Sequence, residues 1–380
     1  MTQYRGLGAD VRGLSINDAV KKAGLDWKTV PLPVLIQGRK ENRPAPEVRA
    51  LVRSDNGGFL GTASSRYKPI HNHMLVKSMI EAASAGGLQL ERLGSLDGGQ
   101  RVWGVASFPN SSFTLEGAAA GIGNRPTIQH GYDRKFDDTT HLQCLMGSGH
   151  APGIAFTVDL IAWRQICGNG AVMDFQLGRF HMTHAGTFDS HSLSQMASMF
   201  AHASVSFHEY EENATRLRSA RITDFQLQLM MVQLFQPQLL VSAIHAGLLP
   251  SAVISPAASM TTFNGIDSAH LLEAAGAHSE VLDSNLFSRP VIRLLELQTT
   301  APGSVPGTLW GAYNTATYWV DHERGRDADS GLNAALFGEG RNLKLGALRL
   351  ARQYEYVLAN RNTEALRRAH ALDVESEEVR

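Results

Sequence analysis

The chain has little of what marks the more easily recognised classes of protein. Cys144 and Cys167 are its only cysteines among 380 residues, and two thiols do not make a disulfide framework. No run approaches the roughly 20 apolar residues of a membrane span, because the longest apolar-leaning stretch, 238–254, is broken by Gly247 and Pro250. The N-terminal sequence, Met-Thr-Gln-Tyr-Arg, has no apolar signal region. A cytoplasmic protein with reduced core cysteines and no membrane partner is therefore expected.

Net charge is also small, at −1, which argues against a uniformly basic nucleic-acid binder. The distribution is uneven, however. Residues 1–53 hold 10 Lys/Arg against 5 Asp/Glu, a charge of +5, whereas residues 261–340 hold 4 against 10, a charge of −6. A chain with one basic and one acidic end can bind an anion locally, or meet a copy of itself, or simply carry an uneven solvated surface.

The N-terminal half reads mainly as β structure. Apolar runs at Val48–Val52 and Phe59–Ala63 flank an Asp-Asn-Gly-Gly turn, which predicts a hairpin. A helix is predicted over His71–Ala85, followed by strands at 88–96 and 101–108 around a second turn, Asp-Gly-Gly. Further strands are expected at 127–132, 141–146 and 154–160. Short turns between strands favour an antiparallel meander.

The C-terminal half reads as helical. The predicted helices cover 189–220, 225–249 with a kink at Pro237, 269–277, 290–297, 308–322 and 342–368. The fold class is therefore α+β, with a strand-strand-helix-strand-strand core. The expected division is an arm over 1–46 that prolines keep extended, a β-rich core over 47–188, a helical region over 189–368 and a flexible tail over 369–380.

Motifs for enzyme chemistry are weak. The glycine-rich segment 121–126 lacks the Gly-Lys-Ser/Thr ending of a P-loop, so no nucleotide or other cofactor is predicted. His181 and His184 with Asp189 are spaced irregularly for zinc, so no metal site is predicted. The pairing of Cys167 with His184 keeps one enzyme alternative open, and no catalytic residue is assigned.

A cation lies within two residues of an aromatic ring at four places: Arg66-Tyr67-Lys68, Arg101-Val-Trp103, Tyr132-Asp-Arg134-Lys135 and Trp163-Arg164. In single-strand binding, cations follow the phosphates and rings stack on bases, each stacked base contributing roughly 1–3 kcal/mol. The alternative is that the tryptophans are core residues and the arginines cover them.

Four longer motifs carry a resemblance to a known family. They are Ser65-Arg-Tyr-Lys-Pro-Ile-His-Asn72, Leu93-Gly-Ser-Leu-Asp-Gly-Gly-Gln-Arg-Val-Trp103, Arg164-Gln-Ile-Cys-Gly-Asn169 and Trp310-Gly-Ala-Tyr-Asn-Thr-Ala-Thr-Tyr-Trp-Val-Asp-His322. Together they resemble the phage/plasmid-like domain-of-unknown-function family, over about 24–351. The chain departs from that family's pattern after Asn169 and at 181–184. The resemblance implies a phage- or plasmid-encoded protein of mobile-element DNA metabolism.

The order of predicted elements is also similar to the annealing core of phage recombinases of the RecT and Redβ type, an analogy at the level of fold. It implies a protein that binds and anneals single-stranded DNA as a ring-shaped or helical homo-oligomer, with a phage exonuclease or a host single-strand binding protein as further candidate partners. The predicted phosphate contacts are Arg53, Arg66, Lys68, Lys77, Arg101, Arg125, Arg134 and Lys135. Tyr67 and Tyr132 are predicted to stack on bases or separate them. The alternatives are a phage structural or host-interaction protein and a metal- or Cys/His-dependent enzyme.

Overall fold

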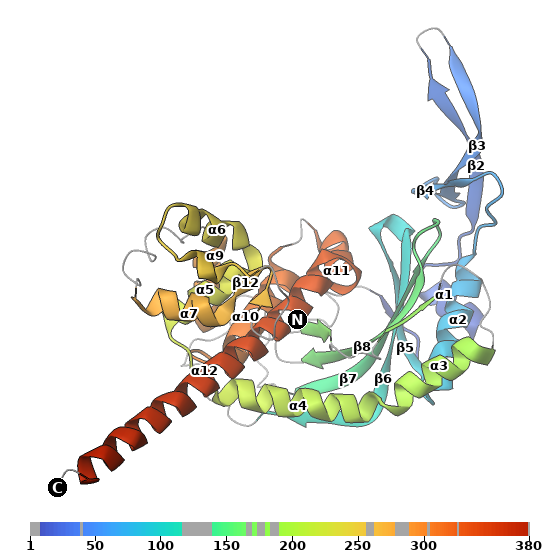
Figure 1. Cartoon of the computed structure of the whole chain (residues 1–380). Helices are drawn as coiled ribbons and strands as arrows, with labels where there is room; N and C mark the ends of the chain where they lie inside the picture. Colours follow the sequence, from blue (N-terminus) through green and yellow to red (C-terminus); the bar gives the residue numbers. More distant parts are fainter. Residues whose placement is uncertain are drawn as a thin grey trace. The chain divides into compact units, whose positions relative to one another are not determined.

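The structure is a computed structural model that describes residues 8–38, 41–115, 139–164, 169–172, 179–182, 190–255, 262–277, 289–301, 305–324 and 327–378. The chain divides into two compact units. The first draws on residues 1–116, 126–210 and 321–341, and the second on 117–125, 211–320 and 342–380. Figure 1 shows the elements of both, and each unit is described separately below.

The first unit contains a three-stranded antiparallel sheet with the order β2-β3-β4. The strands are β2 (Thr29–Gln37), β3 (Asn42–Arg53) and β4 (Phe59–Ser64). The predicted hairpin is confirmed by the pairing of Val52 with Phe59. Its turn forms because Asn56 Oδ1 accepts a hydrogen bond of 2.8 Å from the Gly58 backbone and Gly57 adopts a φ of 72°.

The predicted arm differs from the structure in one respect. Its proline-containing part is extended, but as two paired strands, since β2 pairs with β3 from Thr29↔Arg53 to Gln37↔Asn42. A register shift between Pro33 and Val34 leaves extra residues on β3. Prolines are compatible with such a pair where their missing N–H faces away from the partner strand.

Two helices of the first unit lie beside this hairpin in the sequence. Helix α1 (Ile16–Lys22) begins at Ser15, whose side chain accepts a hydrogen bond from the Asp18 backbone. Helix α2 (Asn72–Ala85) agrees with its predicted range. Asn72 is buried, and its Nδ2 donates to the carbonyls of Leu25 and Trp27 at 2.9 and 3.2 Å. This side chain therefore ties the start of α2 to the connection between α1 and β2.

The main sheet of the first unit has seven strands in the order β1-β5-β6-β7-β8-β10, with β9 also paired to β8. They are β1 (Ala9–Asp10), β5 (Leu90–Leu96), β6 (Arg101–Thr114), β7 (Thr139–Gly149), β8 (Phe156–Arg164), β9 (Asn169–Val172) and β10 (Arg179–Met182). All pairings among these strands are antiparallel, and β5 to β8 follow one another in space as they do in sequence. The predicted meander is confirmed for these strands, and the strand predicted over 127–132 lies outside the described residues.

Helices cover both faces of this sheet. Gly104 faces α2, because a Cβ at this position would lie 3.2 Å from Met79 Sδ. Its neighbours in the pleat face the opposite way, and there the Phe337 ring of α11 (Ala328–Phe337) fills the space over Gly147. A sheet covered by helices on both faces needs strands that are mainly apolar along their length, and β8 is buried at every residue.

The long helix predicted over 189–220 is two helices, α3 (Ser190–Ala201) and α4 (Ala203–Ser219), with His202 between them. The first unit includes α3 and α4 as far as Tyr210. Phe113 of β6 packs against Phe207 and Tyr210 with ring centroids 5.3 and 6.1 Å apart. The α4 aromatics thus extend the helical cover of the sheet.

The second unit is mostly helical, which confirms the predicted α+β class. It contains α5 (Asp224–Phe235), α6 (Pro237–His245), α7 (Ser268–Ala277), α9 (Arg289–Thr300), most of α10 (Leu309–His322) and most of α12 (Glu339–Glu378), with the short strands β11 (Thr262–Phe263) and β12 (Ile266–Asp267). The kink predicted at Pro237 is confirmed as a 103° bend between α5 and α6. Pro237 opens α6 at a position where its missing N–H costs nothing.

A buried amide organises this unit. Gln233 of α5 is fully buried, and its Nε2 donates to Ser268 Oγ at 3.1 Å and to the carbonyl of Ile266 at 3.3 Å. Tyr354 of α12 donates to Gln233 Oε1 at 3.3 Å, and burial raises the pKa of Tyr354. Both polar atoms of the Gln233 amide therefore have hydrogen-bond partners, as a close-packed interior requires.

No single described helix is long and apolar enough to cross a membrane. The pair α5 and α6 passes that test of length and composition only when its two bent halves are taken together.

Candidate nucleic-acid interface

The connection from β4 to α2, residues 65–71, contains three of the predicted site residues, Arg66, Tyr67 and Lys68. It is held to the sheet at two points. Tyr67 donates its hydroxyl to the backbone carbonyl of His150 at 2.7 Å, and the carbonyl of Ile70 lies 2.9 Å from His150 Nδ1. The connection is therefore fixed on either side of Lys68.

His150 is the anchor for both contacts. It directly follows strand β7 in the sequence and is fully buried, and its ring centroid lies 5.1 Å from that of Trp27. Its Nδ1 is also 3.1 Å from Thr29 Oγ1. Because a carbonyl oxygen only accepts, the short contact to Ile70 requires a proton on Nδ1. The imidazole thus joins β2, β7 and the 65–71 connection.

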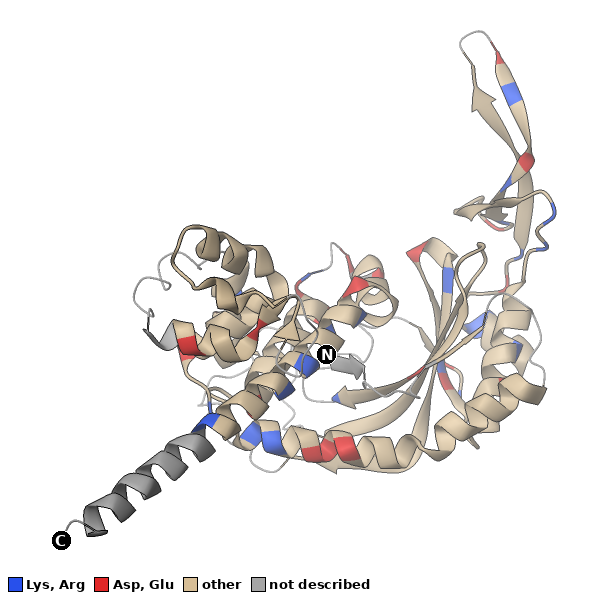
Figure 2. Ribbon diagram, viewed as in Figure 1, with Lys and Arg blue, Asp and Glu red and all other residues tan. Residues whose placement is uncertain are grey.

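Arg66 and Lys68 lie on either side of Tyr67 and are exposed. Within the part of the chain that the structure describes, neither makes an ion pair. Figure 2 shows basic residues along the connection that leads from β4 to α2. The Tyr67 ring is half-buried, and burial raises the pKa of its hydroxyl. Tyr67 therefore positions the two cations that flank it.

Lys77 continues this basic stretch on α2. Its Nζ lies 3.7 Å from Glu81, and both side chains are exposed, so solvent weakens the pair. His73 is one helical turn before Lys77 and is also exposed, which places the two on one helix face. The anchored connection and the first turns of α2 therefore place Arg66, Lys68 and Lys77 on one continuous stretch, residues 66–77.

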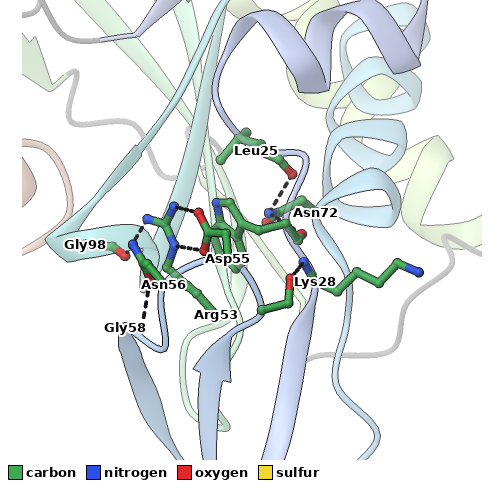
Figure 3. A network of polar contacts seen from close by, with 10 residues as sticks. Leu25, Lys28, Arg53, Asp55, Asn56, Gly58, Asn72 and Gly98 are labelled. Carbon is green, nitrogen blue, oxygen red and sulfur yellow. Dashed lines mark hydrogen bonds and ion pairs between the residues drawn. The ribbon is translucent and has the colours of Figure 1, made fainter.

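Arg53 lies in a different environment, drawn in Figure 3. Its guanidinium forms two hydrogen bonds with Asp55, of 3.0 and 2.6 Å, and a third of 3.1 Å with the carbonyl of Gly98. It also stacks 4.6 Å over the Trp27 ring. The same contact with Arg53 lowers the pKa of Asp55. These contacts commit Arg53 to the junction between the hairpin and the β5–β6 turn.

Arg101 is also committed to an internal contact. Its guanidinium carbon lies 4.6 Å over the Phe337 ring of α11, and the residue is half-buried. Near it, Asn333 of α11 donates to Asp97 of the β5–β6 turn. Burial and the Asp329 carboxylate raise the pKa of Asp97. Arg101 thus belongs to the contact between α11 and the sheet.

The remaining predicted residues, Arg125, Tyr132, Arg134 and Lys135, lie outside the described residues. Of the ten, the structure therefore brings Arg66, Tyr67, Lys68 and Lys77 together on one stretch of chain, and places Arg53 and Arg101 in internal contacts.

Sequence reasoning missed a buried ion pair. Asp159 of β8 is 1% exposed and accepts a hydrogen bond of 2.9 Å from Arg341 of α12, whose side chain is 12% exposed. An acidic residue near the centre of a mainly apolar strand was the available signal, because a buried charge needs a partner. Burial, together with the Asp159 charge, raises the pKa of Cys144 on the neighbouring strand. This buried thiol agrees with the core position predicted for it.

The residues considered for metal binding are only partly described. Cys167 and His184 lie outside the described residues, and His181 is exposed on β10. Among the residues that are placed, no group of three or more His, Cys, Asp or Glu is arranged to hold a metal ion.

Comparison with known proteins identifies a family. A family model described as a domain of unknown function (DUF932) matches residues 59–372. No curated protein and no solved structure matches the chain.

Proposed function

We propose that this chain, which belongs to the DUF932 family, binds single-stranded DNA and anneals complementary strands as a homo-oligomer. The protein would be encoded by a phage or plasmid and would act in the cytoplasm of a bacterial host. Partner proteins that supply or protect single strands, such as an exonuclease, fit the same role.

The observation that carries the proposal is the exposure of Arg66 and Lys68 on a backbone fixed by Tyr67. Cations that meet no carboxylate keep their charge available for phosphate. A fixed backbone also lowers the conformational entropy lost on binding. The near-neutral total charge of −1 is compatible with this, because the contact needs only a local concentration of cations.

The order of elements supports the annealing part. A hairpin, β3–β4, leads into α2, and α2 is followed by the antiparallel strands β5 to β8. This order resembles the strand-strand-helix-strand-strand annealing core of the recombinases of the RecT and Redβ type, and the analogy concerns fold alone. Annealing needs no covalent step: phosphate contacts hold a strand without reading its sequence, and base pairing supplies the free energy.

The direct test is the salt dependence of binding. Titration of the full-length chain with a fluorescently labelled single-stranded oligonucleotide, at several salt concentrations, gives the slope of log K against log salt. Each phosphate contact contributes about 0.7 to that slope for a single strand. The double variant Arg66→Ala/Lys68→Ala is expected to reduce the slope by about 1.4 and to weaken binding.

Two further variants separate contact from positioning. Arg221→Ala/Arg352→Ala removes two exposed arginines of the second unit and is expected to leave both affinity and slope near the wild-type values. Tyr67→Phe deletes the bond to His150 and is expected to weaken binding with an unchanged slope, since no phosphate contact is lost. A wild-type chain that does not bind a long oligonucleotide, or binds it independently of salt, rules the proposal out.

The annealing step has its own readout. Mixing two complementary strands that carry a fluorescence donor and acceptor should give faster pairing with the wild-type chain than without it. The Arg66→Ala/Lys68→Ala variant should lose most of that acceleration, whereas Arg221→Ala/Arg352→Ala should keep it. If the wild-type chain binds single strands but does not accelerate their pairing, it is a single-strand binding protein and not an annealing protein.

A further inference from the structure

The outer end of the β2–β3 hairpin exposes apolar side chains on both of its faces. This outer ribbon consists of Val34–Gln37 of β2 and Asn42–Ala45 of β3, which pair in register. Leu35 is 59% exposed and Ile36 is 60% exposed. Adjacent residues of a strand point to opposite faces, so each face of the ribbon presents one large aliphatic side chain to solvent.

Few of the described residues cover this ribbon. Strand β4 pairs with β3 over Val48–Val52, which is the inner end of the hairpin. Among the described strands, none pairs with the ribbon at its outer end. A two-stranded ribbon with both faces solvated is marginally stable in water, so burial of Leu35 and Ile36 against a partner would stabilise it.

The edges of the hairpin are poorly suited to pairing with another strand. Pro31 and Pro33 interrupt β2, and Pro44 and Pro46 interrupt β3. Proline lacks the N–H that an added strand would need, and it blunts sheet edges against pairing. A partner is therefore expected to pack on the faces of the ribbon through side chains.

The charge of the ribbon indicates the nature of that partner. Arg43 is exposed and lies directly opposite Ile36, so a guanidinium and an aliphatic side chain share one face. Residues 1–53 carry +5 within a chain of net charge −1, which leaves −6 on residues 54–380. A second copy of the chain therefore offers the acidic residues that complement Arg43, next to apolar ones.

We propose that a second copy of this chain packs on both faces of the outer ribbon, and that this is the contact through which protomers assemble. The inference rests on the proposed function only for the homo-oligomeric state, and it does not depend on the position of the DNA. A polynucleotide would complement Arg43 as well, but it would have to bury Leu35 and Ile36 on opposite faces at once. A protein surface that wraps the ribbon does so more readily.

The test is the molar mass of the full-length chain in solution, measured by light scattering after size exclusion over a range of concentrations and without nucleic acid. The wild-type chain is expected to be larger than a monomer. Leu35→Asp/Ile36→Asp is expected to weaken self-association by at least about 30-fold, the loss typical of an interface hot spot. Arg43→Glu should weaken self-association less than this double substitution. It should also make self-association insensitive to salt, because the attraction between Arg43 and acidic residues is lost.

Val205→Asp is the matched control, because Val205 of α4 is 61% exposed in the same unit but lies away from the ribbon in the sequence. It should keep the wild-type mass. All four substituted positions are exposed, so an unchanged circular dichroism spectrum is expected and confirms folding.

Each other outcome overturns the inference. A wild-type monomer at every concentration does so, and so does an unchanged mass for Leu35→Asp/Ile36→Asp. If that variant keeps its mass but loses affinity for a single-stranded oligonucleotide, the ribbon binds DNA instead. The proposed function fails separately, through absent DNA binding by the wild-type chain.

Discussion

The β7–β8 pair and the outer ribbon are both antiparallel pairs with aliphatic side chains. They differ in solvent exposure. β8 is buried at all of its residues, and β7 from Leu142 to Gly149. Leu35 and Ile36 of the ribbon are more than half exposed. The two pairs also differ in proline content. β7 and β8 contain no proline, whereas β2 and β3 contain four, of which Pro44 lies within the outer ribbon.

This contrast separates the part of the chain that holds the fold from the part available to partners. Central strands without proline can accept neighbours on both edges and helices on both faces. A ribbon interrupted by proline can be extended, but its edges do not favour pairing with a further strand, because proline has no N–H to donate. Exposed aliphatic residues on it are therefore better explained by a contact outside the protomer than by the core.

The sharpest difference is expected for arginine. Arg341→Ala leaves the Asp159 carboxylate buried without its 2.9 Å partner, and breaking a buried pair in this way costs about 3–5 kcal/mol in the free energy of unfolding. Arg43→Ala in the ribbon is expected to change that free energy by less than about 0.5 kcal/mol, as at other surface sites. Urea denaturation of both variants measures the difference, and equal values would contradict the assigned burial of the pair.

Leucine gives the second largest contrast. Leu145 of β7 is fully buried, and Leu145→Ala should cost about 2–5 kcal/mol through lost burial and the cavity left behind. Leu35→Ala deletes the same atoms from the ribbon and should cost less than about 0.5 kcal/mol. The comparison is made on monomeric protein at low concentration, because self-association would add stability to the wild-type ribbon. A large loss for Leu35→Ala under those conditions would mean that the ribbon packs within the protomer.

Much of the fold follows from local signals in the sequence. Turn residues at 55–58 and 97–99 set the hairpins, and Pro237 divides α5 from α6. Helix α11 was missed because Ala-Asp-Ser-Gly-Leu-Asn-Ala-Ala-Leu-Phe is short and contains a glycine, which disfavours a helix on propensity alone. It forms where Phe337 and Asn333 pack on the sheet, and such tertiary contacts are not visible in a local pattern.

The candidate site was predictable to a similar extent. The clustering of Arg66, Lys68 and Lys77 follows from their closeness in sequence, and the structure shows them exposed. The surroundings of Arg53 and Arg101 depend on Trp27 and Phe337, which are distant in the chain. A cation next to an aromatic residue in sequence therefore says less about a binding surface than the aromatic ring that the cation reaches in the fold.

The smallest expected effect concerns Asp97, where the sheet meets α11. Burial and the Asp329 charge raise the pKa of Asp97 above its ordinary value of 3.8, so the folded chain holds this proton more tightly than the unfolded one. The contribution of Asp97 to stability is therefore present at low pH and is lost as the pH rises through the raised pKa. Asp97→Asn has no proton to lose and still accepts the bond from Asn333. Asparagine also tolerates the φ of 51° found there.

The Tm of Asp97→Asn relative to the wild-type chain should therefore increase between pH 3.5 and pH 7. The increase should be about 2 °C or less, because solvent screens a half-exposed carboxylate. Asp55→Asn is the opposing control, since Arg53 lowers the pKa of Asp55 and its contribution to stability is lost as the pH falls. A relative Tm of Asp97→Asn that decreases from pH 3.5 to pH 7 would mean that Arg101 outweighs Asp329 at this carboxylate.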